Sequence, residues 1–488
     1  MKSFVFGKTA LVSLIWATSA LAGNQMNTNL VFEARVIDGV SDRVIENGRV
    51  VIVDGVIACV GERTECAVPS GARIIDGDLT VMPGLIDLHT HPKAQYLGYF
   101  LASGVTTIRT ANTDKEDFED LLAQGDGHAE VIWAGPMVDG ANSIMKLFYE
   151  DAENPNGPIR PLSGGHMHGI GIIVAQTPEQ AISAMDSLAE NGLKWTKFYE
   201  QIPLEAFRAG VARAKHHGIR VMADLGMIST RGLKGAEVDL IQAAEAGIDS
   251  LEHASGAALA YQRMGGDLSA MTPDPALIDR MARAIVDNDV TVVPTLSVYY
   301  TYPTVDEAQA ALKELPMGQA TGPVNDSLNG LWRYHYGNGP KPKTAMTDMD
   351  LVEPLVRRVV ELGGRVAVGS DTPAGKFNPP GGGVHKEMEW LVGVGFSPME
   401  AIRAATGTAA EVLDRDDIGV VAQGRRADLL VVRGNPVEDI RVTRQIQYVV
   451  RNGTVHEAST LRRRVEEEGN RLYIERFGEP EEESAGSR

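Results

Sequence analysis

Short β-branched runs alternate with longer stretches of helical periodicity through the middle of this chain of 488 residues. Such alternation predicts parallel strands joined by helical crossovers, and eight repeats fit a TIM (β/α)8 barrel. The fold class is therefore α/β, with helices expected at stretches such as Leu204–His217 and Pro398–Leu413. The eight expected strands are Leu85–His91, Val105–Arg109, Glu130–Trp133, Trp195–Tyr199, Arg220–Asp224, Asp249–His253, Val290–Pro294 and Val366–Asp371.

Two β-rich flanks surround the barrel, which we assign to residues 83–415. Apolar runs in residues 23–82 are broken by Asp54-Gly55, a strong hairpin-turn signal. Further short strands fall within residues 416–457, punctuated by Gly434-Asn435-Pro436 and Asn452-Gly453. We expect the two flanks to pair into one small β-sandwich domain.

The two ends of the chain differ from the body. Residues 1–22 read as a secretory signal peptide, with Lys2 and Lys8, an apolar stretch from Thr9 to Ala22 and an Ala20-Leu21-Ala22 cleavage site. An uncleaved anchor is the alternative, but about 14 apolar residues are short for spanning a bilayer. We expect a secreted or periplasmic protein with no membrane segment in its mature form. Residues 458–488 are charge-rich and should form a helix followed by a disordered tail.

Charge and cysteine content restrict the partners and the compartment. A net charge of −19 disfavours phosphate backbones, which excludes nucleic acid as an expected partner. The chain has two cysteines, Cys59 and Cys66. In an oxidising compartment their spacing suits a disulfide across a hairpin, while two free buried thiols remain the alternative.

Two connections between the expected strands are too long to be turns. The first, Ala134 to Thr177, contains a glycine-rich stretch with His166 and His168. The second, Thr295 to Met349, is rich in tyrosine. We expect both to be long loops on the active face that shape or cover a pocket.

Candidate metal ligands stand at the ends of the expected strands. His89 and His91 lie two residues apart on the first strand, so their imidazoles project to the same face and could hold one ion. A His-x-His pair alone is a weak signal. Lys197, His253 and Asp371 also fall at strand ends, which would converge on one barrel mouth.

Five motifs, in this order, resemble the amidohydrolase superfamily, and more narrowly its imidazolonepropionase-like and prolidase-like members. They are Pro83-Gly-Leu-Ile-Asp-Leu-His-Thr-His91, Trp195-Thr-Lys-Phe-Tyr199, Ser250-Leu-Glu-His253, Val368-Gly-Ser-Asp-Thr-Pro373 and Gly424-Arg-Arg-Ala-Asp-Leu-Leu430. The resemblance covers about Leu30 to Val455.

The resemblance implies one or two divalent ions, with zinc expected. It implies that His89 and His91 bind the more buried ion, and that Lys197 is carboxylated so that it bridges two ions; the alternative is an unmodified, salt-bridging lysine. His253 is implied as a further ligand. The family carries a histidine at the end of strand five, whereas this chain has Asp224 there. Asp224 can still ligate, but an aspartate would favour a harder ion than zinc or hold a second ion weakly.

Asp371 is the implied catalytic carboxylate and a metal ligand. Its expected role is to take a proton from a metal-activated water and deliver it to the leaving nitrogen. The expected reaction is hydrolysis of an amide bond in a short peptide or N-acyl amino acid by metal-activated hydroxide. Two alternatives stay open: a mono-metal deaminase of cyclic amidines, and a non-catalytic metal-binding relative.

Substrate contacts are less constrained, with His166, His168, Tyr199 and Arg231 as candidates. Tyr199 shares a strand face with Lys197 and could stabilise an oxyanion, or simply pack. Arg231 could clamp a substrate carboxylate, or lie on the surface. The pair His216-His217 reads instead as the C-terminus of a helix. We expect a small-molecule or short-peptide substrate, and a homo-oligomer is compatible with the sequence.

Overall fold

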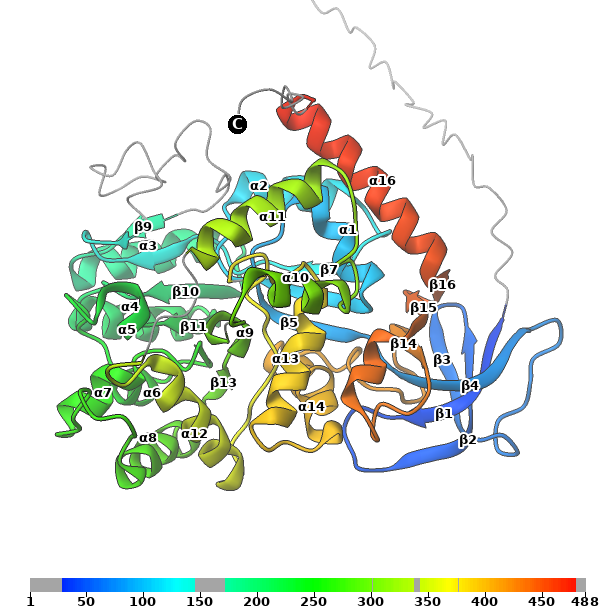
Figure 1. The fold of residues 1–488 in the computed structure, drawn as a ribbon, viewed down its shortest axis with the longest axis horizontal. Coiled ribbons are helices and arrows are strands. Elements are labelled where there is room, and N and C mark those ends of the chain that lie inside the picture. Colours follow the sequence, from blue (N-terminus) through cyan, green and yellow to red (C-terminus); the bar gives the residue numbers. More distant parts are fainter. Residues whose placement is uncertain (1–28, 145–171, 301, 338–342, 376, 480–488) are drawn as a thin grey trace, which may run out of the picture.

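The computed structural model describes residues 29–144, 172–300, 302–337, 343–375 and 377–479 (Figure 1). The expected signal peptide and the two histidines His166 and His168 lie outside these ranges. Within these ranges, no helix combines the length and the apolar character that a membrane crossing requires.

Both flanks of the chain contribute to one seven-stranded sheet, where the blue and the orange-red strands of Figure 1 lie side by side. Its order is β16-β15-β14-β4-β1-β2-β3. The turn between β2 and β3 is the expected Asp54-Gly55 hairpin, with both residues at positive φ, 51° and 82°. The strands are β1 Leu30–Ile37, β2 Val44–Val53, β3 Val56–Glu62, β4 Arg73–Pro83, β14 Leu429–Arg433, β15 Ile446–Arg451 and β16 Thr454–Glu457.

This β domain differs from the expected sandwich, because it is a single curled sheet rather than two stacked ones. Val56, at the start of the edge strand β3, bridges to Arg426, just before the more central strand β14. The Ile57 amide also donates to the carbonyl of Arg425 at 2.9 Å. The curl encloses an apolar core that includes Phe32, Val50 and Leu429, all fully buried.

Nine strands of the middle segment form two parallel sheets. One has the order β13-β12-β11-β10-β8-β9 and the other β5-β6-β7. The strands are β5 Leu85–Thr90, β6 Val105–Thr110, β7 Glu130–Ile132, β8 Met137–Asp139, β9 Ile172–Val174, β10 Trp195–Tyr199, β11 Arg220–Asp224, β12 Ser250–Glu252 and β13 Thr291–Val293. Seven of the eight expected strands are thus present as regular strands.

The eighth expected strand, Val366–Asp371, is not a regular strand, and that prediction was wrong in its detail. The segment lies between the two parallel sheets and contacts both through isolated parallel bridges, Val292 to Val366 and Thr90 to Thr372. A regular strand cannot continue through Asp371, whose φ of 57° lies in the left-handed region.

Helices surround these strands, and capping residues explain several of their starts. The Thr177 and Gln180 side chains form a capping box at the start of α3, and Ser397 with Glu400 does the same for α14. The stretch expected as one helix, Pro398–Leu413, is two helices, α14 and α15. The helices are α1 Ala94–Ala102, α2 Lys115–Ala123, α3 Pro178–Glu190, α4 Leu204–His216, α5 Ile228–Arg231, α6 Leu240–Ala246, α7 Ala257–Arg263, α8 Pro275–Asp287, α9 Leu296–Tyr299, α10 Val305–Lys313, α11 Pro323–Tyr336, α12 Asp348–Glu361, α13 Gly382–Gly393, α14 Pro398–Ala404, α15 Gly407–Val412 and α16 Ala458–Phe477, with the 3-10 helix η2 at Ile440–Arg444.

The two connections expected as loops contain regular structure where they are described. The first holds β8 and β9, whose three residues each are too few to show a sequence period. The second holds α9, α10 and α11. A capping box of Thr304 and Glu307 begins α10, so the sequence carried a helix signal there.

The structure also shows how the two cysteines and the charged C-terminal stretch are arranged. Cys59 and Cys66 form a disulfide, although Cys66 lies in the loop after β3 and not on a partner strand. The charged C-terminal stretch begins with the expected helix, α16, which packs along α1.

A buried ion-pair cluster joins the β domain to the parallel sheets. Asp428, 3% exposed, accepts hydrogen bonds from Arg451 at 3.2 Å and from Arg426 at 2.6 Å. Arg426 also contacts Glu130, at the start of β7, at 2.6 Å. Asp428 is thus a buried carboxylate that two guanidinium groups share.

Asp428→Ala should therefore lower the free energy of unfolding by about 3 kcal/mol, because it leaves the buried guanidinium of Arg451 with only the longer ion pair to Glu130, at 3.7 Å. Asp416→Ala is the matched control, since Asp416 contacts Arg425 at 3.6 Å with a side chain that is 95% exposed. The control should change the free energy by no more than about 0.5 kcal/mol. Urea unfolding measures both, and equal losses in the two variants would contradict the buried role of Asp428.

Candidate functional site

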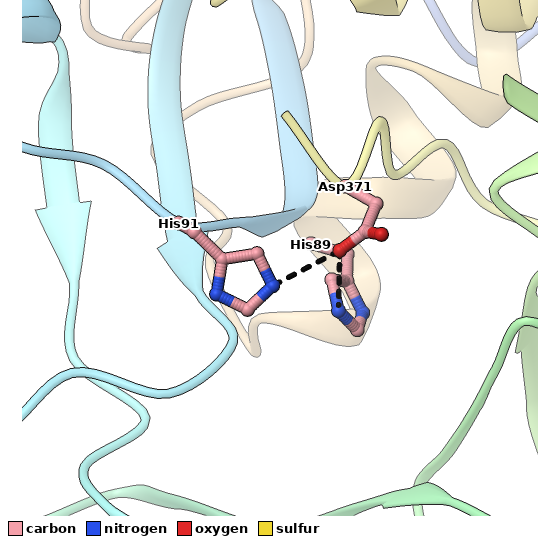
Figure 2. Close-up of side chains that lie close together, drawn as sticks. All are labelled: His89, His91 and Asp371. Carbon is pink, nitrogen blue, oxygen red and sulfur yellow. Dashed lines mark hydrogen bonds and ion pairs between the residues drawn. The ribbon is translucent and has the colours of Figure 1, made fainter. Parts of the chain in front are cut away.

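His89, His91 and Asp371 meet where β5 ends against the irregular segment before Pro373 (Figure 2). His91 Nε2 lies 3.0 Å from Asp371 Oδ1, and His89 Nε2 lies 3.3 Å from the same oxygen. The residues are far apart in the chain, yet one carboxylate oxygen faces both ring nitrogens. The three ligand atoms lie close enough together to hold one metal ion.

Backbone pairing holds this group together. The Asp371 amide donates to the carbonyl of His89 at 2.7 Å, and the His91 amide donates to the carbonyl of Thr372 at 2.8 Å. The close approach needs Gly369: a Cβ there would lie 2.8 Å from the Cβ of His89 and 2.5 Å from Val293 Cγ1. The glycine of Val368-Gly-Ser-Asp therefore allows the segment to lie against β5.

A second group lies at the ends of β10, β11 and β12. Lys197 Nζ lies 2.8 Å from Asp224 Oδ2, and His253 Nε2 lies 3.3 Å from the same oxygen. The rings of His253 and His89 have centroids 4.6 Å apart, so the two groups adjoin. His89, Asp224 and His253 form a second set with ligand atoms close enough for one ion.

Three residues of the site region adopt left-handed backbone conformations. The φ angles are 59° at His253, 45° at Thr295 and 57° at Asp371. Such angles are unfavourable for residues with a side chain and gather at functional sites. The chain turns at His253 and Thr295 just beyond the ends of β12 and β13, and at Asp371 within the irregular segment that lies against β5.

Hydrogen bonds to the outer ring nitrogens orient both buried histidines. His89 Nδ1 lies 2.5 Å from Glu252 Oε2, and an ionised carboxylate can only accept, so His89 donates from Nδ1. His253 Nδ1 contacts the hydroxyl of Thr295, which itself donates to the carbonyl of Pro294 at 2.8 Å. Both imidazoles therefore turn Nε2 towards the site, as metal-binding histidines do.

Burial and neighbouring charges set the protonation of the site. Burial, assisted by the positive charge of Lys197, holds the pKa of His89 well below its ordinary value. His89 is therefore neutral, which is the form that binds a metal. Burial alone would raise the pKa of Asp224, but Lys197 and His253 outweigh it and hold that pKa below its usual range. Asp224 is therefore an anion.

A divalent ion fits the group of His89, His91 and Asp371. His89 Nε2 is buried and has no hydrogen-bond partner among the described residues. Leaving a buried ring nitrogen unpaired is costly unless another group binds it. Two imidazoles and one carboxylate are the three protein ligands of many catalytic zinc sites, which keep a fourth position open.

Glu252 and Arg109 also belong to the site, although neither is among the residues predicted from the sequence. Arg109 Nη2 donates to Glu252 Oε1 at 2.8 Å, and its guanidinium lies 4.3 Å from the ring centre of Trp195. Both charged residues are fully buried. A signal was present, because Arg109 ends and Glu252 nearly ends an expected barrel strand, where a charged side chain that is buried needs a partner.

The candidates for substrate contact are placed less centrally. Tyr199 is 9% exposed, packs with Met137 and Ile172, and lies with its ring centre 5.1 Å from Lys197 Nζ. Arg231, the last residue of α5, donates to the carbonyl of Asn142 at 2.5 Å. Neither contacts the histidine pair in any described interaction. The expectation for His216 and His217 is confirmed, since α4 ends at His216 and His217 caps it.

Similar proteins share this fold over most of the chain. The imidazolonepropionase of Deinococcus deserti is 23% identical over 418 residues, which are 82% of this chain and 88% of that protein. The solved A. niger ochratoxinase is 19% identical, covers 88% of this chain and 96% of its own, and has a TM-score of 0.61. A solved Xaa-Pro dipeptidase with bound methionine is 21% identical, with coverage of 88% and 100% and a TM-score of 0.60.

Other similarity is local. Adenine deaminase 2 of Rhizobium johnstonii is 51% identical to this chain over 51 residues, which are 10% of this chain and 9% of that enzyme. The match thus spans about a tenth of that relative. A model of the amidohydrolase family, by contrast, matches residues 80–456, which include every described residue of the site. This chain therefore belongs to the amidohydrolase family.

Proposed function

We propose that this protein is a metal-dependent hydrolase that cleaves an amide bond in a short peptide or an N-acylated amino acid. The observation that carries the proposal is the meeting of His89 and His91 with Asp371 around the buried Nε2 of His89, which has no hydrogen bond among the described residues. The amide class rests on family membership and on similarity to the solved Xaa-Pro dipeptidase.

Each residue of the site has a distinct task in this proposal. His89 and His91 hold the ion, and zinc is the metal proposed because imidazole ligands suit it. A bound zinc ion lowers the pKa of water to about 7 and polarises a carbonyl oxygen. Asp371 faces both histidines and is the carboxylate placed to take a proton from water and pass it to the leaving nitrogen.

We further infer that the two parallel sheets are parts of one (β/α)8 barrel. The segment before Pro373 contacts β13 on one side and β5 on the other. On the far side, β7 pairs with β6, and β8, which follows β7 directly, pairs with β10. The covered length and TM-scores of the solved relatives support the same arrangement.

The proposed place of action is outside the cytoplasm, in the periplasm or the medium. The signal-like segment 1–22 and the Cys59–Cys66 disulfide support it, because disulfides persist in oxidising compartments.

Deamination of a cyclic amidine on a single ion is a second candidate. The ion pair of Lys197 and Asp224 favours it, because a lysine in such a pair is not a bridging ligand for two ions. The local identity with adenine deaminase 2 supports the same candidate.

A substrate panel distinguishes these activities. Purified protein loaded with zinc is incubated with dipeptides including Xaa-Pro, with N-acyl amino acids and with cyclic amidines. New amino groups from the first two classes support the amide hydrolase, whereas ammonia from the amidines alone supports the deaminase. Bound metal without turnover on any class supports a non-catalytic relative.

Substitution of His89 tests the metal site directly. His89→Ala should lower bound zinc from a stoichiometric amount to nearly none, because it removes the buried ligand of the proposed set. His456→Ala, on β16 and remote from the site, is the control and should keep the ion. Mass spectrometry of the metal after dialysis gives the count, and full retention by His89→Ala would exclude this site.

The catalytic carboxylate gives a kinetic prediction. Asp371→Asn should lower kcat/KM on the active substrate by about 10² to 10⁴-fold, the range that a general base contributes. Asp287→Asn, an exposed aspartate at the end of α8, should leave kcat/KM unchanged. If Asp371→Asn lowers kcat/KM by less than tenfold, Asp371 is not the residue that transfers the proton.

Glu252 should affect metal affinity from outside the ligand set. Glu252→Gln keeps an acceptor for the Nδ1 proton of His89 but removes the charge, and should weaken zinc affinity by about 10 to 100-fold. Asp428→Asn, another buried carboxylate far from the site, controls for general destabilisation. Chelator competition measures the affinity. Equal zinc affinity in the wild type and Glu252→Gln would show that Glu252 only stabilises the fold.

A further inference from the structure

Lys197 and Asp224 belong to the second group of the site, with His253. Both are nearly inaccessible, at 2% and 3% exposure, and their charged atoms lie 2.8 Å apart. The parallel register of β10 and β11 places Tyr199 opposite Asp224, so Lys197 reaches towards the strand end to meet the carboxylate. At the position where the family resemblance implies a histidine, this chain thus has a carboxylate that pairs with the Lys197 ammonium group.

The surroundings of Lys197 suit a cation. Its ammonium group donates to the Asp224 carboxylate and lies 5.1 Å from the centre of the Tyr199 ring, whose face attracts positive charge. A carboxylated lysine is an anion. It would lose both contacts and would face the Asp224 carboxylate as a like charge in a buried position. A histidine at 224 would impose no such repulsion.

His89 limits how many ions the two ligand sets can hold. Both sets include His89, and its Nδ1 is engaged by Glu252. Only the lone pair on Nε2 remains, and one lone pair binds one ion. The set with His91 and Asp371 contains no cationic side chain, whereas in the other set Lys197 lies against Asp224 Oδ2, and of that carboxylate Oδ1 has no hydrogen-bond partner among the described residues.

We propose that this centre holds a single divalent ion at His89, His91 and Asp371, and that the Lys197–Asp224 ion pair fills the place of a second ion. The inference rests on the proposed function as a metal-dependent hydrolase. In this centre Lys197 is an unmodified ammonium, and it supplies a fixed positive charge beside Asp224 and His253. Carbon dioxide is not part of the site.

Metal counting on the wild type tests the proposal. The full-length mature protein is loaded with excess zinc in 13C-bicarbonate, dialysed, and examined by metal mass spectrometry and 13C NMR. One ion per chain and no carbamate signal are expected. Two ions with a carbamate signal would overturn the single-ion centre but leave the hydrolase proposal standing. No bound ion would overturn the proposed function as well.

Substitutions of Asp224 test whether this residue is what excludes a second ion. Asp224→His removes the counter-ion and supplies a neutral ligand, so it should bind two ions per chain and show a carbamate signal in bicarbonate. Asp306→His, at an exposed position in α10, is the control for an added histidine and should stay at one ion. One ion in both variants would contradict the assignment of Asp224 as the residue that closes the second position.

Asp224→Asn covers the case in which the histidine variant does not fold. The amide keeps the size of the side chain and removes its charge. Because Asp224 is not a ligand in the single-ion centre, this variant should keep one ion with an affinity within about threefold of the wild type. Loss of the ion would show that Asp224 binds it and would overturn the proposal.

Discussion

The pairing of the segment around Asp371 with β5 is the interaction on which the site depends. It brings His89 and His91 to a carboxylate from a distant part of the chain, through backbone hydrogen bonds of 2.7 and 2.8 Å. A buried side-chain contact reinforces it, since Asp87 accepts from the Ser370 amide at 2.9 Å and from its hydroxyl. Burial raises the pKa of Asp87 to about 7, although the Ser370 hydrogen bonds oppose the shift.

The segment that follows β13 also stabilises the contact between β5 and the segment around Asp371. Glu387 of α13 accepts hydrogen bonds from the amides of Leu296 and Ser297, at 2.7 and 3.0 Å, and so fixes the start of α9. The Ser297 hydroxyl then donates to the carbonyl of Ser370 at 2.7 Å. Thr295, which contacts His253, directly precedes this helix. The connection expected as a cover for the pocket therefore begins by holding the ligand-bearing segments in place.

The sequence predicts the positions of the site residues well because strand ends carry them. The two-residue spacing of His89 and His91, and the strand-end places of His253 and Asp371, follow from strand geometry and patterning. Interactions between distant segments are not encoded in any local pattern. The contact of His89 with Glu252 and the ion pair of Lys197 with Asp224 depend on which strands become neighbours.

The irregular segment before Pro373 and the shape of the β sheet were also not predicted, because both depend on contacts between distant parts of the chain. The segment ending at Asp371 has the apolar composition of a strand, but its close approach at Gly369 and its left-handed turn reflect contacts with β5 and β13. The single curled β sheet, expected as a sandwich, likewise depends on contacts between distant segments, such as the bridge between Val56 and Arg426.

The central claim is that one ion sits between the histidine pair and Asp371. A crystal structure of the zinc-loaded protein, with anomalous diffraction at the zinc edge, tests it most directly. The account predicts one peak about 2.0 to 2.2 Å from His89 Nε2, from His91 Nε2 and from a carboxylate oxygen of Asp371. A peak bound by Asp224 and His253 instead, or two peaks bridged by a carboxylated Lys197, would contradict it.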